Sequence, residues 1–210
     1  MENIAVKKTR QGKLSFAEIM NHAGDFFMEK GAIHESMRLL AQRLDQDEIG
    51  YAIIGGMALA AHGYARLTLD VDVLVTAEGL QKFKERWLGR GYVPAFPGAN
   101  KSFRDVETKI PIEFITSGEF PGDGLAKPVA FPHPSANEMI QDGIRFISLE
   151  KLIELKLASG LSAPHRLRDL SDVQDLILAL DMPLDFQQHL DSSVQAEYRR
   201  LWQAAQTGRV

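Results

Sequence analysis

The chain has 210 residues, of which 45% are hydrophobic and 25% are charged, a composition typical of a soluble globular protein. Its net charge of −4 disfavours a general nucleic-acid coat, although Lys7, Lys8, Arg10 and Lys13 could form a local basic patch. The lack of cysteine excludes disulfides and thiolate metal sites and fits a reducing cytoplasm. With no signal-peptide pattern and no 18-residue apolar run, we expect a cytoplasmic protein that does not enter a membrane.

In the first half of the chain, the spacing of apolar residues changes from helical to extended and back. Two stretches within residues 16–48 carry apolar residues at helical spacing and predict two helices. "YAIIGG" predicts a short buried strand that ends on two glycines, and "MALAAHG" predicts a short helix. Further on we expect a strand over 67–75, an amphipathic helix ending near 91, and two strands that turn around 105–109.

The second half begins with a Gly- and Pro-rich stretch, 116–134, which predicts a long loop that borders the site and is mobile. A short strand, "IRFI", precedes Ser148, which is expected to cap a helix. Two more helices follow, the last being amphipathic. The order predicts an α/β (α+β) fold with a small mixed sheet, divided into an N-terminal helical segment, a core and a C-terminal helical lobe: 1–48, 49–147 and 148–210.

The stretch "LTLDVDVLV" places two acids in an apolar strand. If it is a strand throughout, alternation forms one apolar core face from five of its residues: Leu67, Leu69, Val71, Val73 and Val75. Asp70 and Asp72 then share the other face with Arg66, about 6.6 Å apart along the strand. Two such carboxylates repel each other unless a cation lies between them, and Mg²⁺ binds carboxylate oxygens. A solvent-facing sheet surface is the alternative for the pair alone.

Two neighbouring features favour a functional site. Gly55-Gly56 sits where the preceding strand ends, and glycines there let backbone N–H groups approach a phosphate. A tight strand-to-helix turn is the alternative explanation. In "KIPIEFI", Ile112 and Phe114 take one face and Glu113 points to the other, which makes it a candidate third acid beside the Asp pair.

The glycine pair, the Asp-x-Asp stretch and the later apolar-Glu-apolar strand together resemble the nucleotidyltransferase superfamily that includes DNA polymerase β. The segment "GGMALAAHGYARLTLDVDVLV" is similar in particular to bacterial AbiEii-like nucleotidyltransferases, and the resemblance covers about residues 50–116. The sequence departs from the superfamily pattern at Gly56, where Ser is commoner, and at Glu113, where Asp is usual.

The resemblance continues into the tail, where "LEKLIELKLASG…HRLRDLSDV" is similar to a Lys-Leu helix followed by Arg-x-Lys-Asp-x-x-Asp, with Arg168 at the Lys position. Helical spacing puts Lys156 on the inward stripe of its helix, where it either snorkels or contacts a nucleotide phosphate. For Arg166 and Asp169 we expect a structural i, i+3 pair.

The resemblance implies transfer of a nucleoside monophosphate from an NTP to a hydroxyl acceptor with release of pyrophosphate. It further implies that Asp70, Asp72 and Glu113 hold Mg²⁺ or Mn²⁺ and carry catalysis. The nucleotide would be bound by the glycine pair and two cations: Gly55, Gly56, Arg66 and Lys156. The acceptor stays open between a tRNA end, a protein hydroxyl and a small molecule.

Two other classes of function also remain open. The chain could be a catalytically silent nucleotide-binding module, for example one half of a toxin–antitoxin-like pair with a protein partner. It could instead be a protein-interaction module whose acids form a solvated face. Pyrophosphate release separates the first from an enzyme, and metal-dependent stabilisation by NTP separates the second.

Overall fold

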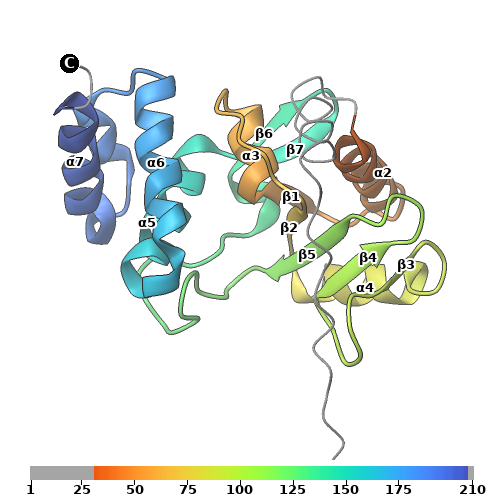
Figure 1. Ribbon diagram of the computed structural model, residues 1–210. Coiled ribbons are helices and arrows are strands. Elements are labelled where there is room, and N and C mark those ends of the chain that lie inside the picture. Colours follow the sequence, from red (N-terminus) through yellow and green to blue (C-terminus); the bar gives the residue numbers. More distant parts are fainter. Residues whose placement is uncertain (1–30, 208–210) are drawn as a thin grey trace, which may run out of the picture.

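The computed structural model describes residues 31–207, so the predicted helix nearer the start of the chain lies outside them. Seven strands form one mixed sheet in the order β3-β4-β5-β2-β1-β7-β6. Parallel pairing joins β2 to β5 and β1 to β7, while the other neighbours are antiparallel (Figure 1). The prediction of a small mixed sheet flanked by helices is thereby confirmed. The strands are β1 (Tyr51–Ile54), β2 (Val71–Val75), β3 (Tyr92–Pro94), β4 (Ser102–Asp105), β5 (Pro111–Thr116), β6 (Glu138–Gln141) and β7 (Ile144–Ile147).

One face of the sheet is largely apolar. Val73 pairs with Phe114 of the neighbouring strand, so their side chains point the same way, and both are buried. Phe83, on the helix α4 that contacts β5, packs its ring 4.5 Å from the ring of Phe114. The opposite face is therefore the one on which polar side chains of β2 and β5 can reach solvent. The helices before and between these strands are α2 (Ala32–Gln46), α3 (Gly55–Ala61) and α4 (Ala77–Trp87).

The strand that carries the acidic pair is shorter than predicted. It begins at Val71, and Leu69, which alternation assigned to the core face, is 56% exposed. The reason lies in the partner strand, because β1 ends at Ile54 opposite Asp72 and the chain then turns into α3. β1 offers no partner beyond that point and the pairing with β5 begins at Val71, so Asp70 lies in irregular backbone just before β2 rather than within it.

Three helices follow the sheet and form a lobe at one side of it (Figure 1). Ser148 caps the first of them as predicted, since its Oγ accepts a hydrogen bond from the backbone N–H of Lys151. The first two helices approach closely at Gly160, where a Cβ would lie 2.5 Å from Leu170 Cγ. These elements are α5 (Leu149–Ser162), α6 (Leu167–Ala179) and α7 (Ser192–Thr207), with 3-10 turns at Pro134–Ala136, Pro164–Arg166 and Leu184–His189.

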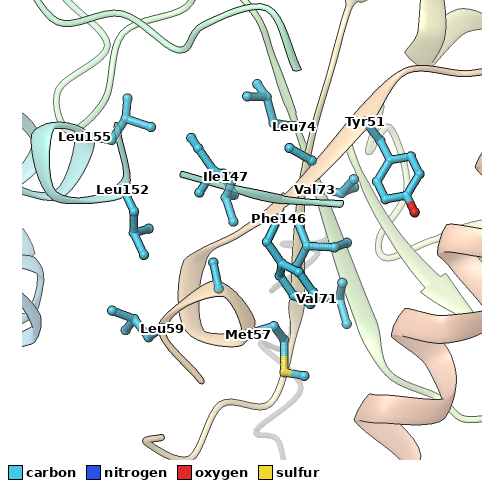
Figure 2. Close-up of a cluster of buried hydrophobic side chains, with 14 of the residues drawn as sticks. Tyr51, Met57, Leu59, Val71, Val73, Leu74, Phe146, Ile147, Leu152 and Leu155 are labelled. Carbon is cyan, nitrogen blue, oxygen red and sulfur yellow. The ribbon is translucent and has the colours of Figure 1, made fainter. Parts of the chain in front are cut away.

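The lobe is joined to the sheet by an apolar contact rather than by a flexible connection. Figure 2 shows Leu152 and Leu155 of α5 near Ile147 of β7, in the cluster that also contains Leu74 of β2. All four side chains are buried. This contact holds the first helix of the lobe at a fixed place beside the polar face of the sheet. Among residues 31–207, no helix is long and apolar enough to cross a membrane.

Candidate functional site

A cleft of about 1010 Å³ lies between the polar face of the sheet and the helical lobe. Its walls come from the β1–α3 turn, the segment before β2, β5, the loop after β5, α5 and the start of α6. The seven site residues predicted from the sequence all line this one cleft: Gly55, Gly56, Arg66, Asp70, Asp72, Glu113 and Lys156. Residues that lie up to a hundred positions apart in the chain are thus brought to a single place.

The position of the Asp72 side chain requires a glycine at residue 55. Its φ of +63° lies in the left-handed region, and a Cβ there would stand 1.9 Å from Asp72 Oδ2. Any other residue would therefore meet both backbone strain and a direct collision with the acid. The glycine lets the carboxylate of β2 lie against the backbone at the end of β1, which is a local reason for this glycine that needs no ligand.

Gly56 makes room for a second side chain, Thr68. A Cβ on Gly56 would lie 2.7 Å from Thr68 Cβ, so the threonine occupies the volume that a larger residue would fill. Thr68 is only 8% exposed, and its Oγ1 donates a hydrogen bond to Asp70 Oδ1 at 2.7 Å. This contact holds the acid that lies outside the strand.

The third acid projects from β5 beside the first two. Glu113 is the register partner of Asp72 on the parallel neighbour, so both side chains leave the sheet on the same face. On its other side Glu113 is paired with Ser102 of β4, whose Oγ donates to Glu113 Oε2 at 2.7 Å. The polar face thus carries the three carboxylates in adjacent positions.

Asp72 is electrostatically the most perturbed of the three acids. Burial raises its pKa, the negative charges of Asp70 and Glu113 raise it further, and the net result is about 7 although Lys156 acts in the opposite direction. A carboxyl group with a pKa near 7 is partly protonated at neutral pH. A bound cation can take the place of that proton.

The donor set fits a hard divalent cation by its chemistry. Asp70, Asp72 and Glu113 offer carboxylate oxygens alone, which are the ligands that Mg²⁺ and Mn²⁺ prefer, and their mutual repulsion would be relieved by a bound cation. As the side chains of residues 31–207 stand, however, no group of three or more His, Cys, Asp or Glu is arranged to hold an ion. Two of the three acids, Asp70 and Glu113, which we call the outer acids, instead accept hydrogen bonds from Thr68 and Ser102 respectively.

The opposite wall carries a buried network of charges around Asp172, which the sequence did not single out. Asp172 is 2% exposed and accepts two hydrogen bonds from Arg66, at 2.6 and 2.9 Å, and one from Lys156 at 2.6 Å. Lys156 also donates to Asp169 at 3.0 Å, and Arg166 pairs with Asp169 at 3.2 Å, as predicted for that i, i+3 pair. Three cations and two carboxylates leave this network with one net positive charge.

Two more basic side chains line the same wall, His165 in the 3-10 turn before α6 and Arg168 in the first turn of α6. Both are exposed, and neither forms an ion pair with any residue of the described part of the chain. Arg168 therefore offers the cleft a guanidinium that no carboxylate among the described residues neutralises. The sequence drew attention to Arg168 only as a departure from the Lys of related chains and gave it no role.

Lys127, in the loop after β5, is directed away from the cleft. Its Nζ donates to the carbonyl oxygen of Pro121 at 2.6 Å and to Ser162 Oγ at 3.3 Å, and it forms an ion pair with Asp123. Lys127 is not among the residues that line the cleft. It fastens the loop after β5 to the end of α5.

Comparison with known proteins places the fold. No family model matches the chain, and a search of curated proteins finds no significant match. Among solved structures, an antigenic nucleotidyltransferase-like protein from Paracoccidioides brasiliensis is 19% identical, with a TM-score of 0.52 over 81% of this chain and 87% of that chain. The structure of ANT(2")-Ia in complex with adenylyl-2"-tobramycin is 13% identical, with a TM-score of 0.47 over 85% of this chain and 98% of that chain.

The first of these two structures defines the class of architecture. The chain has the nucleotidyltransferase fold, a mixed sheet with a helical lobe beside it, and the sequence-based prediction of that fold is confirmed. At identities this low the likeness concerns the fold alone. The narrower similarity to AbiEii-like proteins stays a prediction.

Proposed function

We propose that this protein is a metal-dependent nucleotidyltransferase that transfers a nucleoside monophosphate from an NTP to a hydroxyl acceptor. The observation that carries the proposal is the arrangement of charge in the cleft. Three carboxylates line the sheet side, and the opposite wall carries a network with net positive charge together with Arg168, which forms no ion pair among the described residues. An NTP with a divalent cation is a ligand that presents positive charge to the first wall and phosphates to the second.

On this proposal Asp70, Asp72 and Glu113 hold Mg²⁺ or Mn²⁺. A bound divalent ion would stabilise the charge that develops on the attacking and leaving oxygens. Glu113 would take the proton of the acceptor hydroxyl as a new bond forms between that oxygen and the α-phosphorus. The bond to the β-phosphate oxygen breaks in the same displacement, and pyrophosphate leaves.

The phosphates would be bound mainly from the lobe side. Arg66 and Lys156 contribute through a network that is already paired, so Arg168, which forms no ion pair within residues 31–207, is the stronger candidate for a direct contact. Gly55 and Gly56 also line the cleft, and on this proposal their backbone N–H groups would contact the phosphates. The acceptor class remains a hydroxyl of a tRNA, a protein or a small molecule.

The test is release of pyrophosphate from each of the four NTPs with Mg²⁺ or Mn²⁺, in the presence of tRNA, protein and small-molecule hydroxyl acceptors in turn. We expect release with at least one nucleotide, and we expect Glu113→Gln to abolish it because the amide cannot accept the acceptor's proton. If nucleotide binds but no pyrophosphate appears with any NTP, the alternative holds, and the chain is a silent nucleotide-binding module with a protein partner.

A further inference from the structure

The two outer acids of the cleft share a feature that their own motifs do not contain. Each accepts a hydrogen bond from a hydroxyl group next to it in the fold: Asp70 from Thr68 and Glu113 from Ser102, both at 2.7 Å. Ser102 reaches Glu113 only because β4 and β5 pair in a register that places the two residues opposite each other. A hydroxyl donates one proton, so in each pair the second carboxylate oxygen is left for another partner.

The hydroxyl of Thr68 is held in place by its surroundings. Its β-branched side chain has few rotamers, is 8% exposed, and fills the space above Gly56 where no Cβ fits. Packing therefore fixes the Thr68 hydroxyl at the position from which it donates to Asp70.

Glu113 has a greater need for such a contact. Its side chain is one methylene longer than Asp, and it is exposed on the face of β5, so it has more rotamers to choose among. The hydrogen bond from Ser102 Oγ selects those rotamers in which one carboxylate oxygen faces β4.

We propose that Thr68 and Ser102 are positioning residues for the metal site, each fixing one oxygen of an outer acid so that the other is presented to the cation. This inference rests on the proposed function. Groups that orient metal-binding side chains in this way commonly change metal affinity about 10–100-fold when they are removed. A purely structural role for the two hydroxyls would leave metal affinity unchanged.

The test is Mn²⁺ binding to the full-length protein without nucleotide, measured by electron paramagnetic resonance of free Mn²⁺. Ser102→Ala and Thr68→Val each remove a hydroxyl while nearly preserving side-chain volume, and we expect each to weaken Mn²⁺ binding about tenfold. Ser102→Thr and Thr68→Ser, which restore a donor at the same place, should bind within about twofold of the wild type.

A matched control exists outside the cleft. Ser193 Oγ donates to Asp191 Oδ1 at 2.6 Å, the same kind of pair with the same spacing as Thr68 and Asp70, and neither residue lines the cleft. Ser193→Ala should leave Mn²⁺ affinity unchanged.

Each remaining outcome counts against a specific claim. Unchanged or tighter Mn²⁺ binding in both Ser102→Ala and Thr68→Val would overturn the positioning role while leaving the metal site intact. Absence of Mn²⁺ binding by the wild-type protein would overturn the metal site itself, and the positioning role with it. Melting temperatures recorded for every variant separate loss of affinity from loss of fold.

Discussion

At the scale of single residues, Asp72 and Asp172 are two acids with opposite effects on the free energy of unfolding. Asp72 lies near like charges and its pKa is raised to about 7, first by burial and then by Asp70. Asp172 accepts hydrogen bonds from Arg66 and Lys156. Replacing Asp72 by the isosteric Asn should therefore raise the free energy of unfolding, whereas replacing Asp172 by Asn should lower it.

We expect Asp72→Asn to stabilise the metal-free protein. Because the folded-state pKa is above the unfolded value of 3.8, the native state binds more protons between about pH 4 and pH 7, and stability is lost as pH rises through that range. Asn removes that loss, so the gain should be about 1–2 kcal/mol at pH 8 and near zero at pH 4. Urea unfolding at both pH values measures it. A loss of stability at pH 8 would show that this acid serves the fold.

We expect Asp172→Asn to have the opposite effect, because it leaves two cations facing each other in a buried place. Removing one partner from a buried ion pair typically costs about 3–5 kcal/mol. Urea unfolding at pH 8, under the same conditions as for Asp72→Asn, gives the comparison. An unfolding free energy equal to the wild type would mean that Arg66 and Lys156 find other partners. The contact of Asp172 on α6 with Arg66 before β2 would then not stabilise the fold.

At the scale of elements, helices and strands whose apolar residues recur at regular spacing could be predicted from the sequence. Strands whose bounds depend on pairing with a neighbouring strand could not. α5 and β5 follow from helical spacing and alternation. The start of β2 depends on where β1 stops, and the short strands β3 and β6 exist only as partners of β4 and β7. The same holds in the site: the acids and glycines were found from their motifs, but Ser102 reaches Glu113 only through register.

The loop after β5 provides a prediction at this scale. We expect Gly122→Ala to detach the loop from α5, because a Cβ there would lie 2.1 Å from Ser162 Oγ and 2.8 Å from the carbonyl oxygen of Ser159. Limited proteolysis should then cut within residues 117–131 faster than in the wild type, and stability should fall by about 1–3 kcal/mol. The earlier expectation of a mobile loop predicts no difference.

Gly124 is the matched control for this change. Its φ of +75° is nearly that of Gly122, at +77°, but a Cβ at Gly124 would meet nothing within 4 Å. Gly124→Ala therefore carries the same backbone strain without the collision. Equal cleavage rates in the two variants would assign the effect to strain and not to the contact with α5.

At the scale of the whole molecule, the cleft lies between the sheet and the helical lobe, and the proposed nucleotide would contact both. Arg168 belongs to the lobe, is exposed and forms no ion pair among residues 31–207, so its loss should not disturb the metal-free fold. We expect Arg168→Ala to keep the wild-type melting temperature without ligand and to weaken nucleotide binding about tenfold. Isothermal titration with Mg²⁺ and a non-hydrolysable NTP analogue measures this. Equal affinity would place the phosphates elsewhere in the cleft.

A nucleotide should stabilise this molecule only together with a divalent cation. Without one, a triphosphate would enter a cleft whose sheet side already carries Asp70, Asp72 and Glu113, and like charges would oppose binding. With Mg²⁺ or Mn²⁺, binding to the native state at a hundredfold excess over the dissociation constant adds about 2.7 kcal/mol. For a chain of this size that corresponds to a rise in melting temperature of about 5–11 °C. A thermal-shift series of the four NTPs, with and without each metal, measures it. A shift that is the same with and without metal would contradict a metal-bridged site, and no shift under any condition would favour a protein-interaction module whose acids merely face solvent.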